Sequence, residues 1–320
     1  MTNIQQTQSE QAASFKQSYN SPWSHLAIGV VGGDLRQCIT ARELEREGFL
    51  IYTYALGKTE SCITVGRPAQ TLEELINRCD ALLLPLPVSR NGYTLHTPLS
   101  TESIPFTGLF SAIQESGKTP LIMGGRVSEA VAQTAADYDI AIIDYYEREE
   151  LQIANAIPTS EGAIELAMKH FPYTLHNSNC TVLGFGRIGK VLAKTLRALG
   201  ANVCVVARKE TDFAWIDAMD CTPVPLGELE RALCRCQLLF NTVPSMLIGS
   251  EQLQQLSRDT VLIDLASVRG IDAQSAKEHG NQLFWALSLP GKTAPGTAGC
   301  IIKNSVMRIL TESFEGGGQQ

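Results

Sequence analysis

The sequence predicts an α/β protein with two doubly wound parallel-sheet domains, and three observations support this fold class. Short aliphatic runs alternate with helical patterns through both halves of the chain, as they do in sheets built from βαβ units. A Gly-x-Gly-x-x-Gly turn at 184–189 follows one of these runs and opens a helix. With 320 residues, the chain is long enough for two domains that each bury a core.

The first half of the chain predicts a parallel sheet of its own, in a Rossmann- or flavodoxin-like domain over 23–155. Asp34 with Gln37 resembles a capping box for the helix after the first strand, and Gly48 is a helix stop. Thr71 caps another short helix. The expected strands are aliphatic or aromatic runs at 26–31, 49–54, 81–84, 121–124 and 141–144.

The second half predicts a Rossmann domain over 156–296, joined to the first domain by bridging helices. A helix opened by Pro158, with Ser160 as its N-cap, leads into it. An amphipathic helix at 297–314 ends the chain and is expected to pack back on the first domain. The other elements are strands at 181–183, 202–207, 238–243, 261–267 and 283–287, with a helix around 226–236.

The glycine turn predicts a dinucleotide site. Gly184 permits the turn, Gly186 lets the backbone approach a pyrophosphate, and Gly189 lets the helix lie close to the strand. Free N–H groups at the start of the helix then face the phosphates. The alternative is a Rossmann unit that binds no nucleotide. The turn residues predicted to contact the cofactor also include Phe185, Arg187 and Ile188.

The end of the next strand favours NADP over NAD. An NAD site usually has Asp or Glu here for the ribose 2′-OH, whereas this chain has Ala207, Arg208 and Lys209, and two cations suit a 2′-phosphate. The alternative is that both are solvated residues ending a strand. Further cofactor contacts are expected after the two following strands, from residues that could equally be ordinary turn residues: Thr242, Val243, Pro244, Leu265, Ala266 and Ser267.

Composition narrows the class of protein. A net charge of -7 without a basic stripe argues against nucleic acid and anionic membranes as partners, and no apolar run reaches the roughly 20 residues of a membrane helix. Nine cysteines without a CxxC pair suggest reduced thiols of the cytoplasm and no metal site. Residues 1–22 contain no signal peptide and are expected to be a disordered tail. We also expect a homo-oligomer.

The order of the two domains and the Arg269-Gly270 pair after a strand resemble D-2-hydroxyacid dehydrogenases. These enzymes need a histidine late in the sequence as the acid and base for the substrate carbonyl. The one late histidine here is His279, at a helix end where a solvated C-cap is the expected role. Hydride transfer without that histidine suggests a substrate whose oxidation is not alcohol to ketone.

Over nearly its whole length the chain resembles the A-subunit family of dipicolinate synthase. The resemblance is carried by 28–37, by 157–163 and on to the glycine turn, by 263–267 and by 289–299. Arg269 stands where relatives are expected to have a Pro-Gly turn, so that loop is expected to differ. The resemblance implies a cytoplasmic enzyme of the mother cell in a spore-forming bacterium. It also implies NADP-dependent oxidation of a CH–CH bond, from dihydrodipicolinate to dipicolinate, with a flavoprotein-like B subunit as partner.

This reaction aromatises a ring and develops no alkoxide, so the protein must chiefly hold a dicarboxylate beside the nicotinamide. The candidate proton acceptor is His96, although a surface histidine would look the same. Two further functions stay open: another NADP-dependent oxidoreductase of the hydroxyacid dehydrogenase type, and a nucleotide-binding subunit without catalysis. The candidate carboxylate ligands, each of which could instead be a cap or a solvated cation, are Gly296, Thr297, Ala298, Arg36, Ser89, Asn91 and Arg126.

Overall fold

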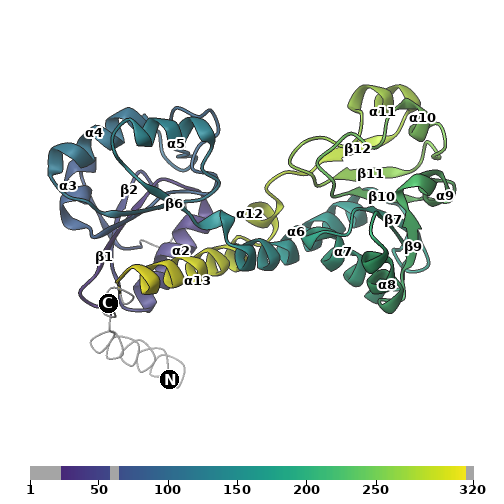
Figure 1. The fold of residues 1–320 in the computed structure, drawn as a ribbon, viewed down its shortest axis with the longest axis horizontal. Helices are drawn as coiled ribbons and strands as arrows, with labels where there is room; N and C mark the ends of the chain where they lie inside the picture. Colours follow the sequence, from purple (N-terminus) through teal and green to yellow (C-terminus); the bar gives the residue numbers. More distant parts are fainter. Residues whose placement is uncertain (1–22, 58–64, 315–320) are drawn as a thin grey trace, which may run out of the picture. The chain divides into compact units, whose positions relative to one another are not determined.

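The computed structural model describes residues 23–57 and 65–314, so the tail expected at 1–22 lies outside the described residues. The chain divides into two compact units (Figure 1). The first unit comprises the residues up to Gln152 and those from Pro295 onward, and the second comprises Ile153–Ala294. The boundaries expected from the sequence were 155 and 296.

The first unit contains a six-stranded sheet in which all neighbours are parallel. In sheet order its strands are β3 (Arg67–Pro68), β2 (Leu50–Tyr54), β1 (Ala27–Val31), β4 (Ala81–Leu83), β5 (Leu121–Gly124) and β6 (Ile142–Asp144). The five expected strands are present, and β3 is the addition. It was missed because it has two residues, one of them a proline, which an edge strand tolerates.

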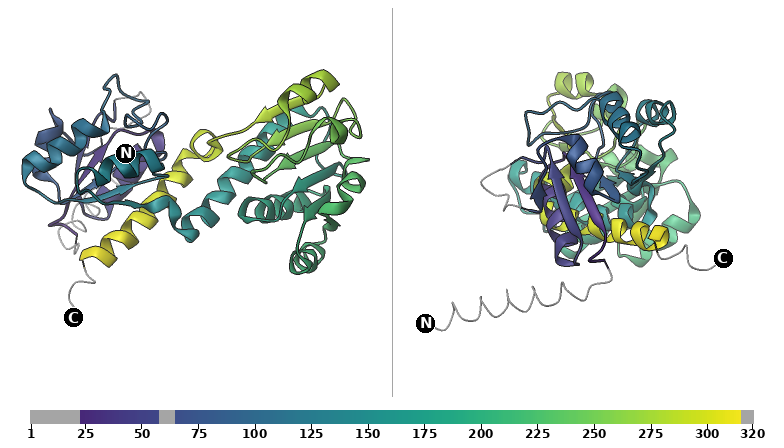
Figure 2. Two further views of the ribbon diagram at one scale, coloured as in Figure 1. Left: turned by 45° about the horizontal axis from the view of Figure 1, so that its top comes forward. Right: turned by 90° about the vertical axis from the view of Figure 1, so that its left-hand side faces the viewer.

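Helices cover both faces of this first sheet. Alternate residues of β1 point to opposite faces: Ile28 and Val30 belong to one core cluster, and Ala27 and Val31 to the other. The first cluster includes residues of α2 and α13, which pack against each other (Figure 2). The helices of the unit are α2 (Leu35–Arg46), α3 (Leu72–Arg78), α4 (Phe106–Ser116), α5 (Glu129–Ala136), the 3-10 turn η1 (Tyr145–Glu147) and α13 (Pro295–Phe314).

The second unit repeats the same strand order. Its sheet is also parallel throughout and consists of β12 (Gln282–Trp285), β11 (Val261–Asp264), β10 (Leu238–Asn241), β7 (Asn179–Leu183), β8 (Asn202–Ala207) and β9 (Thr222–Pro225). The edge strand β9 was not expected because it contains two prolines. The helix α6 (Glu149–His170) begins in the first unit and continues into the second. The other helices of the second unit are α7 (Arg187–Ala198), α8 (Glu210–Ala218), η2 (Leu226–Glu228), α9 (Leu229–Leu233), α10 (Ser250–Leu253), α11 (Ala273–His279) and α12 (Leu289–Thr293).

The two sheets confirm the predicted fold class of two doubly wound parallel domains. In each, chain order reverses beside the first strand, between β1 and β4 in one sheet and between β7 and β10 in the other. In such sheets ligands bind outside the carboxyl ends of the strands at this switch point. Each unit therefore has one place where a ligand is expected.

The bridging helix differs from its prediction. It begins at Glu149, nine residues before Pro158, and continues through the proline. Ser160 is therefore not an N-cap: it is fully buried, and its hydroxyl donates to the carbonyl of Ala156 at 2.8 Å. The prediction was wrong because it treated proline as a helix start, whereas packing of buried residues such as Ala163 and Ala167 sustains the helix on both sides of it.

The cap of α2 also differs in part. Asp34 is the N-cap, as predicted, and accepts a hydrogen bond from the N–H of Arg36 at 3.0 Å. Gln37 does not complete a capping box, because its amide donates to the carbonyl of Leu83 at 3.2 Å. The predicted cap by Thr71 is present and accepts from the N–H of Glu74.

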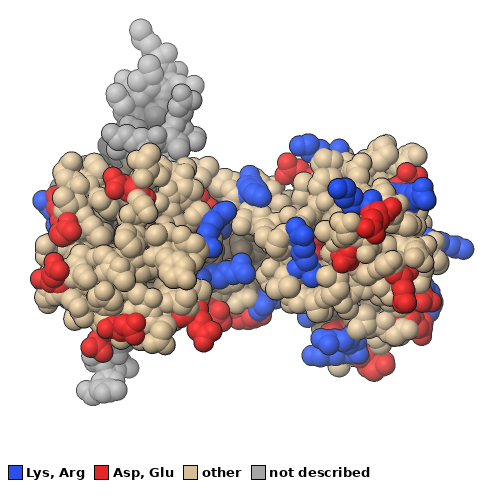
Figure 3. Space-filling model, turned by 90° about the horizontal axis from the view of Figure 1, so that it is seen from above, with Lys and Arg blue, Asp and Glu red and all other residues tan. Residues whose placement is uncertain are grey.

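Charged side chains of both signs share the surface. On the face drawn in Figure 3, both basic and acidic residues are visible on each unit. Among the helices of the described residues, none has the length and hydrophobicity needed to cross a membrane. Over the same residues, His, Cys, Asp and Glu form no group of three or more that could hold a metal ion.

Candidate functional site

The predicted glycine turn lies at the switch point of the second sheet, between β7 and α7. Gly184 has a φ of +92°, and a Cβ there would lie 2.7 Å from the hydroxyl of Thr242. A Cβ on Gly189 would lie 2.2 Å from the carbonyl oxygen of Gly184. Both positions therefore require glycine, one for its backbone conformation and one for the close approach of helix to strand.

Gly186 has a different environment, because a Cβ there would meet no atom within 4 Å. It is the N-cap of α7, and no side chain caps the helix. The first N–H groups of α7 are thus available beside open space, which is the arrangement that binds a pyrophosphate. No acidic residue lies in the first turn, so nothing there repels an anion. The turn fits a dinucleotide.

The predicted cofactor residues divide by exposure. Buried side chains, which leave only their backbone to contact a ligand, are those of Phe185, Ala207, Leu265 and Ala266. Exposed or half-buried side chains are those of Arg187, Ile188, Arg208, Lys209, Thr242, Val243, Pro244 and Ser267. Arg208 and Lys209 follow β8 directly, and Lys209 is the N-cap of α8.

A buried carboxylate organises the loops on the other side of the switch point. Asp264 is 1% exposed and accepts a hydrogen bond from the amide of Asn241 at 2.8 Å. It also accepts from the N–H groups of Ala266 at 3.1 Å and Gly270 at 2.8 Å. These bonds turn the chain immediately after β11, so the strand ends at Asp264 and the prediction that it runs to Ser267 was wrong.

Asn241 has the corresponding role after β10. Its side chain accepts from the N–H of Val243 at 3.1 Å and donates to the carbonyl of the same residue at 3.0 Å, and β10 ends there rather than at the expected residue 243. Thr242 donates its hydroxyl to the carbonyl of Leu183 at 2.8 Å. The loops expected beside the nicotinamide are thus fixed by buried polar contacts. The sequence predicted the loop residues, Asn241 among them, but not the hydrogen bond between Asn241 and Asp264 that fixes these loops.

Arg269, where the sequence departs from the turn expected in relatives, stacks on an aromatic ring. Its guanidinium lies 4.5 Å from the centroid of Trp285, a geometry typical of cation–π contacts. The indole N–H of Trp285 donates to the carbonyl of Ala266 at 3.0 Å. The late histidine, His279, has its Nδ1 2.8 Å from the side-chain oxygen of Asn281. It is the last residue of α11, whereas the glycine turn lies between β7 and α7.

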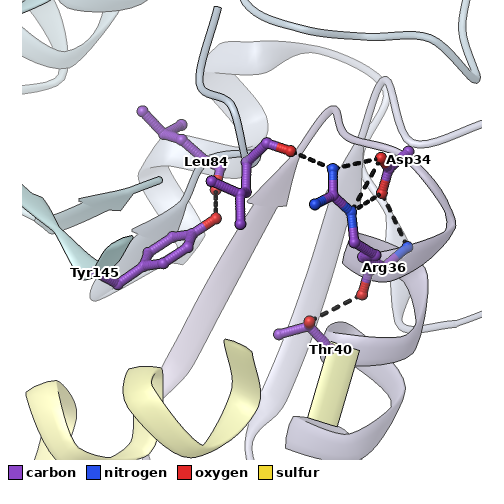
Figure 4. A network of polar contacts seen from close by, with 6 residues as sticks. Asp34, Arg36, Thr40, Leu84 and Tyr145 are labelled. Carbon is purple, nitrogen blue, oxygen red and sulfur yellow. Dashed lines mark hydrogen bonds and ion pairs between the residues drawn. The ribbon is translucent and has the colours of Figure 1, made fainter. Parts of the chain in front are cut away.

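In the first unit, the loops after β1 and β4 are joined across the switch point by Arg36 (Figure 4). The guanidinium pairs with the carboxylate of Asp34 through Nε and Nη2, the Nη2 contact being 2.7 Å. Nη2 also donates to the carbonyl of Leu86. Arg36 is 5% exposed, so the structure places this candidate carboxylate ligand in a fixed, largely buried position.

Tyr145 makes a second buried contact with the segment after β4. Its ring is fully buried, and its hydroxyl donates to the carbonyl of Leu84 at 3.1 Å (Figure 4). Burial raises the pKa of this phenol above its ordinary value; Arg36 opposes this effect, and Asp144 and Asp34 add to it. The phenol therefore stays protonated and acts as a donor. A Cβ on Gly125 would lie 2.6 Å from the ring, which explains the glycine there.

His96 lies against the glycines that follow β1. The N–H of Gly33 donates to the carbonyl of His96, and the N–H of His96 donates to the carbonyl of Val88. A Cβ on Gly32 would lie 2.9 Å from Thr97 and 3.1 Å from the carbonyl of His96. The Gly32-Gly33 pair therefore admits the segment that carries His96.

Ser89 and Asn91 shape a tight turn in that segment. The hydroxyl of Ser89 donates to the carbonyl of Thr94 at 2.6 Å, and the side-chain oxygen of Asn91 accepts from the N–H groups of Tyr93 and Thr94, each at 2.9 Å. Both predicted ligands thus have partners within the turn. Between them stands the exposed Arg90, which sequence reasoning did not select because nothing in its neighbours marks it as more than a surface cation.

The remaining candidates lie on other elements of the first unit. Arg126 is exposed after β5, with a φ of +55° and its N–H donating to Asp144 at 2.9 Å. Gly296 and Thr297 are exposed in the first turn of α13, whereas Ala298 is 2% exposed. The next residue, Gly299, accepts from the hydroxyl of Thr40 at 3.0 Å, which brings the start of α13 beside α2 and Arg36.

Comparison with known proteins divides the chain between 146 and 157, where the structure also divides into its two units. Residues 27–146 match the family described as the N-terminal domain of the dipicolinate synthase A subunit. Residues 157–276 match the D-isomer specific 2-hydroxyacid dehydrogenase, NAD binding domain. The second unit is therefore an NAD-binding domain of dehydrogenase type, which agrees with the geometry of its glycine turn.

Similarity extends over nearly the whole chain. It is 32% identical to the dipicolinate synthase A subunit of Bacillus subtilis (strain 168), over 90% of this chain and 96% of that protein. The crystal structure of the A subunit from Bacillus halodurans superposes with a TM-score of 0.82 at 30% identity, covering 90% of this chain and 98% of that one. The corresponding B. subtilis structure has a TM-score of 0.80. The chain thus belongs to the A-subunit family of dipicolinate synthase.

Proposed function

We propose that this chain is the A subunit of a two-subunit dipicolinate synthase and oxidises dihydrodipicolinate to dipicolinate with NADP. The observation that carries the proposal is the match to the B. subtilis protein of that name along 90% of the chain. The open glycine turn of an NAD-binding domain supports it. In line with the family, the partner is a flavoprotein-like B subunit, and the setting is the mother cell of a spore-forming bacterium.

Particular residues of the second unit are assigned to the cofactor. When bound, NADP⁺ supplies a hydride acceptor. The N–H groups at the start of α7 hold the pyrophosphate beside Gly186, and Arg208 and Lys209 hold the 2′-phosphate. Thr242 and Ser267 are assigned to the nicotinamide side, and the fixed loops that carry them, held by Asn241 and Asp264, support this assignment.

The proposed reaction explains why the chain needs no catalytic histidine late in its sequence. Dihydrodipicolinate gives up a hydride to NADP⁺ and a proton to a base, and the products are dipicolinate and NADPH. No alkoxide develops, so a late histidine that deprotonates an alcohol is unnecessary. His279 is already hydrogen-bonded to Asn281, which fits a structural role at the end of α11.

A second function is favoured by one observation. The second unit matches the NAD-binding domain of 2-hydroxyacid dehydrogenases, so another oxidoreductase of that type is the alternative enzyme. The position of His279 counts against it, because α11 ends just before the amino end of β12, whereas the glycine turn follows the carboxyl end of β7 in the same parallel sheet. A nucleotide-binding subunit that needs its partner for any turnover is the alternative outside enzymes.

The test follows NADPH formation from freshly made dihydrodipicolinate, by the absorbance of the reduced nicotinamide, with and without the B subunit. Turnover by the chain alone, or with the partner, supports the proposed reaction. Turnover only with the partner also shows that the chain is an obligate subunit. Absence of NADPH in both mixtures would overturn the proposal, and a 2-hydroxy acid substrate in place of dihydrodipicolinate tests the alternative enzyme.

A further inference from the structure

The first unit has a switch point that the dinucleotide does not use. Order reverses between β1 and β4, and ligands bind outside the carboxyl ends of strands at such points. Resting on the proposed function, we propose that this place binds a pyridine dicarboxylate through Arg36 and Arg90, and that His96 accepts the proton that leaves the ring. Arg90 and the joint site of these three residues go beyond the assignments above.

Arg36 is a cation held in advance in one orientation. Asp34 and the carbonyl of Leu86 occupy its Nε and Nη2, and its side chain is 7% exposed. Nη1 makes no hydrogen bond with any other described residue, and no buried side-chain nitrogen within 23–57 or 65–314 lacks a partner. Nη1 is therefore not completely buried. It has donor capacity left for a ligand, and the fixed position of the guanidinium lowers the entropy lost on binding.

Arg90 supplies a positive charge that no described residue of the first unit pairs with in an ion pair. It is exposed at a turn closed by Ser89 and Asn91, and it forms no ion pair with the described residues. Arg36, by contrast, is balanced by Asp34. The group at this switch point thus has an excess positive charge, which suits a carboxylate. The hydrogen bonds of Ser89 and Asn91 hold the backbone that carries Arg90.

The backbone of His96 joins the segment after β1, which leads to Arg36, to the segment after β4, which leads to Arg90. This backbone is bonded to Gly33 on one side and to Val88 on the other, so its position relative to the loops after β1 and β4 is set. Burial lowers the pKa of His96. The positive charges of Arg90 and Arg36 lower this pKa further, and the negative charge of Asp34 raises it. The imidazole is therefore neutral at neutral pH and can accept a proton.

The proton step balances without another reactant. One ring hydrogen leaves with its two bonding electrons as hydride to NADP⁺, and the second leaves as a proton to a nitrogen of His96. The electron pair left on the ring completes the aromatic system. The imidazolium then releases its proton to water, which restores the neutral base.

The binding part is tested by isothermal titration of dipicolinate, the product, into the full-length protein. Arg90→Gln is expected to weaken binding about 10- to 100-fold, the range for loss of a charged hydrogen bond. Arg46→Gln removes an exposed arginine from α2 and is the matched control, expected to bind as wild type does. Equal affinities of R90Q and R46Q, or no binding by the wild type, would overturn the site. An unchanged thermal unfolding curve shows that each variant is folded.

The proton part is tested with His96→Gln in steady-state turnover. We expect kcat to fall about 100-fold with little change in the Kd of dipicolinate. In the wild type, kcat is expected to fall as pH drops through the lowered pKa of His96, and this acid limb should vanish in H96Q. If H96Q keeps both the wild-type kcat and the fall of kcat at acid pH, His96 is not the proton acceptor.

The two proposals fail in different ways. If the wild type forms NADPH but R90Q binds dipicolinate normally, the reaction stands and the site is wrong. If dipicolinate binds through Arg90 but no NADPH forms with or without the partner, the site stands and the reaction is wrong.

Discussion

At the scale of single residues, the proposed preference for NADP rests on Arg208 and Lys209, two exposed cations that directly follow β8. Replacing both with Ala is expected to weaken NADP binding about 10- to 100-fold, because charge-assisted bonds to the 2′-phosphate are lost. NAD lacks that phosphate, so its Kd should change little. Fluorescence titration of both nucleotides measures this. Lys194→Ala with Arg197→Ala, two exposed cations on α7, is the control. Equal losses for NADP and NAD would contradict the assignment.

The glycines of the turn make a second prediction at this scale. A Cβ on Gly189 would lie 2.2 Å from a backbone oxygen that cannot move independently, so Gly189→Ala should push α7 from the turn. We expect a loss of about 1–3 kcal/mol in the free energy of unfolding and a loss of NADP binding. Gly227→Ala is the control, because a Cβ there meets nothing within 4 Å. Denaturant unfolding compares the two, and similar stabilities would contradict the steric argument.

At the scale of elements, the sequence pattern predicted those helices, strands and turns that are determined by residues close together in the chain. The glycine spacing at 184–189 and the aliphatic run before it lie within one stretch of sequence, so the β7–α7 turn could be recognised directly. The end of β11 could not, because it is set by Asp264 bonding to Gly270 six residues later. The joining of Arg36 to Leu86 and the approach of His96 to Gly33 depend on contacts over 50 or more residues. For this reason Arg90 was missed.

The bridging helix α6 gives a prediction at this scale as well. Pro158 stands inside the helix, where proline removes a backbone hydrogen bond and crowds the preceding turn. Pro158→Ala is expected to raise the free energy of unfolding, by about 1–3 kcal/mol. Pro295 begins α13, a position where its missing N–H costs nothing, so Pro295→Ala should change stability little. A lower stability for P158A, measured by urea unfolding, would indicate that the helix needs the local geometry of proline.

At the scale of the whole molecule, two sheets of the same strand order stand one after the other in the chain, and each has its own switch point. If the second holds the dinucleotide and the first holds the dicarboxylate, each ligand should protect a different unit. Hydrogen exchange followed by mass spectrometry separates them, because a ligand slows exchange of the amides that it orders.

NADP is expected to slow exchange at 184–190 and 207–210, where the N–H groups of α7 and the start of α8 would bind phosphates. Dipicolinate is expected to slow exchange at 32–37 and 86–97, the segments tied together by Arg36, Gly33 and His96. In R90Q the second pattern should disappear while the first remains. Protection by dipicolinate confined to the second unit would place the carboxylates on the cofactor domain, and the repeated sheet order would then reflect fold alone rather than a division of binding between the two units.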